Sequence, residues 1–505
     1  MPLPASDPAL CRALATDLTA ADYRTDALRE AWGAAADGAL GRGHALPIRR
    51  HLVGDTTALA VVARLFGIGD AVAVDEASIA FPTVGVAGLE ALGLAVRERG
   101  MLRPTALVRP QAFIDDDAVG EWWIASDLDE AALGGPLPED HVLGVGGASL
   151  TLAGLQLSTP VARALDLGCG CGIQSLRARR AAASLVATDV SQRALRYTRL
   201  NALVNGVDAI DTRAGDMFAP VAGEAFDRIV SNPPFVITPR VSGVPAYEYR
   251  DGGRVGDALV AEFIAGVGAH LVPGGAAQLL GNWETREGRT GLDRVRDWVE
   301  AAGLDAWVIE RELLDPVAYA ELWIRDAGTL PGTAAFDDLL GAWLDDFAAR
   351  GVSEVGFGYI LLRRPVGAVT LARYERMPQP VAEHALGAQL ARSLAAHDRL
   401  FAIDDAGLAA SVLLVAGDVT EARHHLPGAE APSVIELRQG GGFGRVCEVD
   451  PALAALVGAC DGDLAVGPLI AAIAQLLEVD ADALHADLLP RVRELLFTGF
   501  LGFAG

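Results

Sequence analysis

A glycine-rich turn follows an apolar run near residue 164. The segment DLGCGCG, from Asp166 to Gly172, begins in the last residues of a predicted strand over 164–167. It ends directly before a helical stretch over 173–183. Glycine lets the backbone turn tightly and lets a ligand approach without a Cβ in the way. Because nucleotide-like ligands bind over the carboxyl ends of strands in a doubly wound sheet, we expect this turn to hold one; a plain strand-to-helix connection is the alternative. The expected contacts are Asp166, Gly168, Cys169, Gly170 and Gly172.

Two acidic residues stand at the ends of the next predicted strands. Asp189 follows the strand over 184–188, at the spacing from Asp166 where a Rossmann-type site needs a carboxylate for the ribose hydroxyls, and Val190 comes next. Asp216 stands where a third strand would finish, so its carboxylate could accept the exocyclic amine of an adenine while Met217 packs on the ring. An acidic helix cap is the alternative for Asp216.

A rigid loop, Asn232-Pro233-Pro234-Phe235, follows the predicted strand over 226–230. Two adjacent prolines fix φ and remove backbone donors, so Asn232 is presented in a set direction. Its amide offers both a donor and an acceptor, which suits a planar NH2 group held while its nitrogen attacks a methyl group. Phe235 can stack on a flat substrate. We expect this loop to be catalytic, and Asn232 also to face the cofactor.

The run from Ala164 to Phe235 resembles the class I methyltransferases that carry an N-P-P-[YF] loop. This resemblance extends over roughly residues 140–365. It implies a mostly parallel, seven-stranded Rossmann-like sheet, S-adenosylmethionine (SAM) as the methyl donor, direct in-line transfer and no metal. The residues that carry it are Asp166 to Gly172, Asp189, Asn201-Ala202, Asn205-Gly206, Asp216 and Asn232 to Phe235.

Two branches of that superfamily compete. HemK-like enzymes methylate a glutamine side-chain amide of translation release factors, and small-domain ribosomal RNA enzymes methylate a guanine amine. The segment from Tyr249 to Asp257 is similar to the glycine-rich segment of the first branch, and Val236 stands where the second usually has histidine. Phe235 in place of tyrosine departs from the glutamine pattern. We expect a protein glutamine as the acceptor; a ribosomal or transfer RNA nucleobase (guanine N2 or adenine N6) and a small molecule stay open.

Short apolar runs alternate with helical stretches between residues 164 and 365, which is typical of a parallel sheet covered by helices. This α/β block is the expected methyltransferase domain, residues 141–365. The predicted strands are 164–167, 184–188, 226–230, 276–280, 307–311 and 356–362, and the predicted helices are 192–203, 257–270 and 292–302.

The flanking parts, residues 1–140 and 366–505, are expected to be mainly helical and winged-helix-like. Residues 10–14 and 57–66 have helical spacing, and Ala106-Leu107-Val108 and Glu121-Trp122-Trp123-Ile124 flank a polar turn at 115–117, which predicts a strand pair. At the other end, apolar residues at helical spacing predict short helices over 464–477, 480–486 and 488–497. We expect breaks between them at 479–480 and at Pro490.

Composition excludes several classes of protein. The net charge of −25 weighs against a large nucleic-acid footprint, although a local basic groove stays compatible with it. The five cysteines form no CxxC pair, and adjacent His424-His425 point different ways, so no metal or disulfide framework is expected. No long apolar run is present, which favours a cytoplasmic protein.

Other interpretations of the chain carry less weight. Arg177, Arg179 and Arg180 are expected on a solvated helix face, and one of Trp122 and Trp123 in the core. A SAM-sensing nucleic-acid-binding regulator is the non-enzymatic alternative, but the terminal helices are acidic. The flanking parts are expected to recognise a protein partner or RNA, or to dimerise.

Overall fold

A computed structural model describes residues 3–114, 119–135, 137–208, 210–241, 244, 250–379, 381 and 386–504. The polar turn at 115–117 and Tyr249, both used above, lie outside the described residues. The chain divides into two compact units, one of Met1–Ala153 with Pro160–Pro378 and one of Gly154–Thr159 with Gln379–Gly505.

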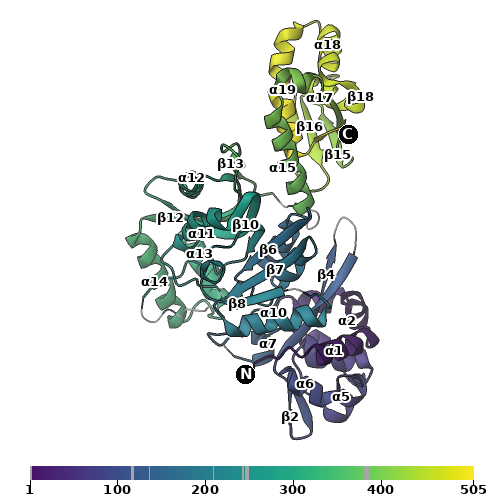
Figure 1. Ribbon diagram of the computed structural model, residues 1–505, viewed down its shortest axis with the longest axis vertical. Coiled ribbons are helices and arrows are strands. Elements are labelled where there is room, and N and C mark those ends of the chain that lie inside the picture. Colours follow the sequence, from purple (N-terminus) through teal and green to yellow (C-terminus); the bar gives the residue numbers. More distant parts are fainter. Residues whose placement is uncertain are drawn as a thin grey trace. The chain divides into compact units, whose positions relative to one another are not determined.

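An eight-stranded sheet organises the first unit (Figure 1). Its order is β13-β11-β12-β10-β9-β6-β7-β8, and neighbours pair in parallel except β12, which runs antiparallel to β10 and β11. The strands include all six that the sequence predicts and the third strand expected before Asp216. They are β6 (Val161–Leu167), β7 (Ala182–Asp189), β8 (Ile210–Ala214), β9 (Phe226–Ser231), β10 (Leu271–Arg286), β11 (Asp305–Leu314), β12 (Val352–Arg363) and β13 (Ala372–Arg376).

The strand order reverses between β6 and β9, which are adjacent although β7 and β8 intervene in the chain. Such a switch point opens a crevice at the carboxyl ends of the two strands, and ligands of doubly wound folds bind there. The glycine turn follows β6, and the Asn232–Phe235 loop follows β9. The topology therefore brings the two strongest sequence motifs to one crevice.

Helices cover the sheet, and their starts are set by side-chain caps. Ser191 accepts the Ala194 amide at the start of α10, and Thr290 accepts the Asp293 amide at the start of α12. The three predicted helices are present, the second as α11 followed by a 3₁₀ turn. The helices are α9 (Ile173–Arg179), α10 (Gln192–Val204), α11 (Ala258–Val267), α12 (Gly291–Ala302), α13 (Pro316–Asp326) and α14 (Ala334–Ala349).

Strand β13 extends the expected seven-stranded sheet beyond residue 365. Asp305, at the start of β11, accepts the backbone amides of Thr370 and Leu371 at 2.7 and 2.9 Å and pairs with Arg363. These bonds hold the returning chain against the edge, so that Ala372–Arg376 pairs with β11. The short, polar strand lacks the apolar run that marks a buried strand, which is why the sequence pattern ended too early.

The amino-terminal part is mainly helical, as predicted, and adds a small sheet of order β1-β3-β2 that the sequence did not predict. The predicted strand pair is confirmed as the antiparallel hairpin of β4 and β5. The elements are α1 (Pro8–Ala20), α2 (Thr25–Leu40), α3 (Leu46–His51), α4 (Ala58–Val62), β1 (Val72–Ala73), α5 (Val74–Ala80), α6 (Gly85–Ala91), β2 (Ala95–Glu98), β3 (Met101–Pro104), β4 (Leu107–Ile114), β5 (Val119–Ser126), α7 (Glu130–Leu133) and α8 (Gly147–Leu155).

Two asparagines join this hairpin to α10. Asn201 bonds the amide and carbonyl of Ala125 at 2.8 and 2.9 Å, and Asn205 bonds those of Trp123 at 2.9 and 2.8 Å. Each side chain thus acts as a short piece of strand beside β5. One apolar core contains residues of α1–α6, β5, α9 and α10, so these parts share their packing.

The second unit combines helices with two three-stranded sheets, of order β18-β14-β19 and β15-β16-β17. The expected break at Pro490 is wrong, because α19 runs through it. Proline removes one hydrogen bond, whereas Leu488, Leu489, Val492 and Leu495 around it are buried and hold the helix. The elements are α15 (Leu386–Ala402), α16 (Asp405–Ala409), β14 (Val412–Val415), β15 (Val419–His424), β16 (Val434–Gln439), β17 (Val446–Val449), α17 (Pro451–Gly458), β18 (Asp461–Ala465), α18 (Val466–Leu477), α19 (Ala481–Thr498) and β19 (Leu501–Phe503).

Candidate active site

The three glycines of the turn all adopt a left-handed backbone. Their φ angles are +78° at Gly168, +52° at Gly170 and +87° at Gly172. A Cβ on Gly168 or Gly170 would meet no atom within 4 Å, whereas one on Gly172 would lie 2.9–3.1 Å from Thr198 on α10. Gly172 therefore allows α9 and α10 to pack, and Gly168 and Gly170 leave open space of the kind that a bound nucleotide would fill.

Asp166 lies beneath this turn and is completely buried. Its Oδ2 accepts the Ser175 hydroxyl at 2.6 Å, while its Oδ1 has no hydrogen-bond partner among the described residues. Burial raises the pKa of Asp166 to about 7, and the charge of Asp189 adds to the rise while the Ser175 bonds oppose it. A cationic ligand nearby would favour the ionised form, and SAM carries both a sulfonium and an ammonium.

Asp189 holds the glycine turn in place. Its Oδ2 accepts the Gly170 amide at 2.9 Å, and its Oδ1 accepts the Ser191 amide at 2.9 Å. The carboxylate is partly exposed, as is Val190 beside it. The structure thus places Asp189 against the turn, and its bond to the ribose stays a prediction.

The cysteines of the turn are buried, and their thiols have low reactivity. Burial raises the pKa of the Cys169 thiol far above its usual range and that of Cys171 to about 11. The Thr198 hydroxyl lies 3.2 Å from the Cys169 sulfur. A nucleophilic thiolate is excluded at both positions, which leaves small size as their contribution.

Asp216 follows β8 and is exposed. Its Oδ2 accepts Nη2 of Arg254 at 2.9 Å, and Arg254 also bonds Glu262 at 2.8 Å. Met217 adopts a φ of +47° and packs against the apolar core of the sheet. Sequence reasoning missed these ion pairs of Arg254. The glycine-rich segment that contains Arg254 indicated a family resemblance but did not show which residues the arginine would contact. The adenine contact of Asp216 and Met217 stays a prediction.

Asn232 stands at the end of β9, where Ser231 fixes the strand to β6 by donating its hydroxyl to the Leu167 carbonyl at 2.7 Å. The Asn232 Nδ2 donates to the Ser149 hydroxyl of α8 at 3.3 Å, and the backbone carbonyl of Ser149 accepts Gln174 at 2.7 Å. The buried Oδ1 of Asn232 has no partner among the described residues. Its amide oxygen is thus available to a ligand.

The rest of the loop is braced by the glycine-rich segment that follows it. Phe235 and Asp251 form an antiparallel bridge, with the Gly252 amide 3.1 Å from the Pro234 carbonyl. Pro233 is buried, and the Phe235 ring packs 5.3 Å from that of Phe357 on β12. The loop is therefore supported on both sides.

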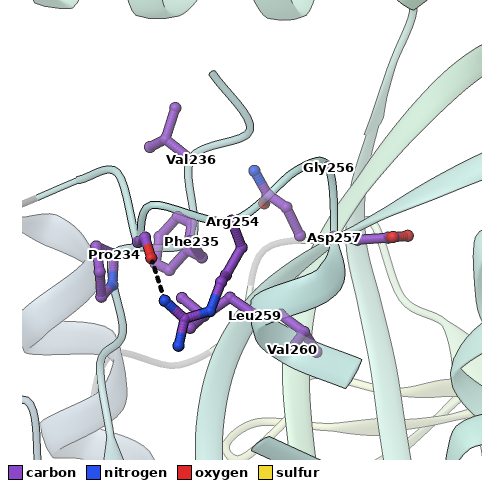
Figure 2. Close-up of a pocket in the computed structure, with 10 residues that line it drawn as sticks. Pro234, Phe235, Val236, Arg254, Gly256, Asp257, Leu259 and Val260 are labelled. Atoms are coloured by element: carbon purple, nitrogen blue, oxygen red, sulfur yellow. Dashed lines mark hydrogen bonds between the residues drawn. The ribbon is translucent and has the colours of Figure 1, made fainter. Parts of the chain in front are cut away.

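A pocket opens beside this loop (Figure 2), and Arg254 crosses it to the Gly252 carbonyl at 3.5 Å. Apolar Leu259 and Val260 of α11 contribute one part of the lining, and Phe235 contributes another. The full lining is Pro234, Phe235, Val236, Gly252, Arg254, Gly256, Asp257, Leu259, Val260 and Asn282. A flat apolar or amide-bearing group fits such walls better than a phosphate.

Acidic groups around the pocket are matched by arginines. Asp257 is buried and bonds Arg294 at 2.8 and 2.9 Å, and Glu284 pairs with Arg286 and Arg350. Burial and the neighbouring Asp257 raise the pKa of Glu284, while Arg350 opposes the rise. The pairs neutralise each other, so the acceptor side of the site carries little net charge.

The remaining candidates have structural roles. Arg177 is half-buried and donates to the Ala153 carbonyl at 3.0 Å, so the expected solvated face is wrong for this arginine. Trp122 is buried, as expected for one of the pair, and the half-buried Trp123 donates to the Tyr23 carbonyl.

Among the described residues no three potential metal ligands cluster, and no helix is long and apolar enough to cross a membrane.

Comparison with known proteins identifies the central part of the chain. Residues 146–297 match the methyltransferase small domain family, and two domains of unknown function match residues 20–105 and 394–502. The release factor glutamine methyltransferase of Cereibacter sphaeroides is 38% identical over 159 residues, which are 29% of this chain and 54% of that protein. The chain spans about half the length of the curated relatives it matches.

Two other relatives differ in their named targets. The ribosomal protein uL3 glutamine methyltransferase of Bradyrhizobium diazoefficiens is 30% identical, covering 28% of this chain and 46% of that protein. The ribosomal RNA small subunit methyltransferase C of Mannheimia succiniciproducens is 32% identical, covering 23% and 31%. A sarcosine dimethylglycine methyltransferase structure from Galdieria sulphuraria covers 43% of this chain and 81% of that one, with 15% identity and a TM-score of 0.27.

The strand order, the glycine turn and the family match define the class together. Residues 146–297 match the methyltransferase small domain family and form part of a Rossmann-like sheet, and SAM is the cofactor of this class of site. The residues fit that cofactor, because there is open space over Gly168 and Gly170 and because the Asp166 Oδ1, which has no partner in the described part of the chain, can accept a hydrogen bond.

Proposed function

We propose that this protein transfers a methyl group from SAM to the side-chain amide nitrogen of a glutamine in a translation-related protein. The observation that carries the proposal is the Asn232 amide, whose nitrogen donates to Ser149 and whose buried oxygen has no partner among the residues that the structure describes. The glutamine methyltransferases among the relatives support the acceptor class, although each shares only part of its length with this chain.

An amide nitrogen is a poor nucleophile because its lone pair is delocalised. When bound, SAM supplies an electrophilic methyl group. We expect the Asn232 Oδ1 and the Pro233 carbonyl to accept the two N–H hydrogens of the acceptor amide, so that charge developing on its nitrogen meets fixed dipoles. The rigid prolines keep those dipoles aligned without reorganisation. Alignment of nitrogen, methyl and sulfur supplies about 7–11 kcal/mol more.

Phe235 and the neighbouring pocket hold the acceptor in place. The Phe235 ring is fixed against Phe357, and Val236 donates to the Arg250 carbonyl at 2.9 Å, so neither moves freely. Leu259 and Val260 give the same pocket an apolar wall. A planar amide lying on Phe235 would present its nitrogen toward Asn232.

The test is transfer of radiolabelled methyl from SAM into separated protein and RNA fractions of a bacterial lysate, with Asn232→Ala as the comparison. We expect label in a release-factor-sized protein and a fall in turnover of about 10²–10³ in the variant, since a single preorganised dipole is worth that much. The affinity for SAM, measured by calorimetry on both proteins, should change far less. Equal losses of affinity and turnover would contradict the role of Asn232.

The second candidate is methylation of an RNA nucleobase, which the similarity to the ribosomal RNA methyltransferase favours. The net charge of −25 opposes binding to a phosphate backbone. Label recovered in ribosomal or transfer RNA, and not in protein, would establish this candidate in place of the first.

A further inference from the structure

A buried asparagine, Asn282, lines the pocket beside the Asn232–Phe235 loop. Ser231 of β9 pairs with Leu279 of β10, and Asn282 lies three residues beyond that pair, about 10 Å along the strand. It lines the pocket together with Pro234 and Phe235 and is only 1% exposed. Neither its position nor its neighbours were evident from the sequence, because Asn282 lies inside a long strand and belongs to no motif.

The amide nitrogen of Asn282 already has a hydrogen-bond partner within the protein. The Asn282 Nδ2 donates to the hydroxyl of Tyr319 on α13, and the same hydroxyl accepts the Ile237 backbone amide at 3.0 Å. Tyr319 is itself buried in an apolar cluster that includes Ile237, Trp343 and Phe347. The tyrosine thus fixes the asparagine and the chain beyond Phe235 relative to each other.

The next feature is the amide oxygen of Asn282. The Oδ1 of Asn282 has no hydrogen-bond partner among the described residues, as is also true of the Oδ1 of Asn232. An unpaired buried acceptor destabilises a protein by about 1–3 kcal/mol, so a donor supplied by a bound ligand would stabilise it. The side chain of Asn232, just after β9, and that of Asn282, inside the adjacent β10, therefore share one arrangement, with the nitrogen bonded to a hydroxyl and the oxygen without a partner among the described residues.

The charges nearby restrict what that donor is. Arg254 is engaged by Asp216 and Glu262, and Arg294 is engaged by Asp257. An anionic group would find no unopposed cation among these arginines. Two carbonyl-type oxygens favour instead a neutral group that carries N–H hydrogens.

We propose that Asn282 is a specificity-determining residue whose Oδ1 accepts a hydrogen bond from a second N–H of the acceptor, next to the nitrogen that Asn232 binds. This inference rests on the proposed function, which supplies the acceptor pocket. A glutamine within a polypeptide offers such a pair, one from its side-chain amide and one from the backbone. An acceptor with a single N–H hydrogen would satisfy only one of the two oxygens.

The variant Asn282→Leu tests the proposal because leucine has a similar size and no polar atom. With unmethylated bacterial release factor as the probe, we expect KM to rise about tenfold while kcat stays within about threefold, since a hydrogen bond present in both ground and transition states affects KM. SAM affinity should stay within about twofold. Asn232→Ala, measured alongside, should show the opposite split, with the larger effect on kcat.

Failure of this inference differs from failure of the proposed function. If the wild-type protein labels RNA and not release factor, the proposed function is wrong, and the same comparison of KM and kcat is made on that RNA. An unchanged KM on whichever acceptor is labelled overturns the role of Asn282.

The melting temperature of the free protein, which needs no acceptor, distinguishes a role of Asn282 in binding the acceptor from a role in stabilising the fold. An asparagine kept for a ligand contributes little to the free protein, so Asn282→Leu should melt within about 3 °C of wild type. A larger drop would mean that the amide holds the fold together through Tyr319, and would overturn the proposal.

Discussion

Gly172→Ala should separate the packing role of the glycine turn from its ligand-binding role. Position 172 has a φ of +87°, which costs an L-residue about 1–2 kcal/mol. The new Cβ would also lie 3.0 Å from the Cα of Thr198, and such overpacking costs about 1–3 kcal/mol. Because a backbone atom cannot rotate away, the two costs add to about 2–5 kcal/mol of lost stability.

Gly170→Ala is the matched control. It has a φ of +52°, and its Cβ would meet nothing within 4 Å, so only the backbone strain of about 1–2 kcal/mol applies. That Cβ would, however, enter the space where we place SAM. We therefore expect Gly170→Ala to lose SAM affinity by at least about tenfold while it stays the more stable of the two variants.

The assay is urea unfolding followed by tryptophan fluorescence, since Trp283 and Trp307 are fully buried in the sheet, with calorimetry for SAM. Equal destabilisation of the two variants would refute the steric argument about Thr198. Unchanged SAM affinity in Gly170→Ala would refute the assignment of the open space to the cofactor. Adding Thr198→Ala to Gly172→Ala should restore only part of the stability, because the backbone of residue 198 would still crowd the new Cβ.

Two further predictions concern buried charges. The folded pKa of Asp166, about 7, lies above its unfolded value, so the folded protein binds more protons and the free energy of unfolding falls as pH rises from about 4 to 7. Asp166→Asn should remove that dependence and gain stability relative to wild type at pH 8, by an upper bound of about 4 kcal/mol; parallel urea midpoints for the two proteins at pH 5 and pH 8 would refute this. Asp127 is buried and bonded by Arg193 and by the Tyr197 hydroxyl, each at 2.7 Å, so Arg193→Met should cost about 3–5 kcal/mol by leaving the carboxylate unpaired. A loss below about 1 kcal/mol in urea unfolding would show that the charge is relieved in another way.

Much of the sheet could be predicted because parallel strands buried on both faces are encoded as apolar runs. The runs at 164–167, 184–188 and 226–230 needed no tertiary information, and the glycine turn, Asp189 and the loop from Asn232 lie at their carboxyl ends. Strand β13 could not be predicted, since bonds from Asp305 and not its own pattern hold it at the edge.

By itself, the sequence determined the chemistry at the strand ends: three glycines, which adopt positive φ without strain from a Cβ, and an asparagine before two prolines. Only the tertiary structure decided which distant groups meet them. Ser149, Arg254 and Asn282 carry no local signature, because their importance comes from where other elements place them. Local residue types fix backbone shape, whereas hydrogen-bond partners across the crevice depend on how the whole sheet is assembled.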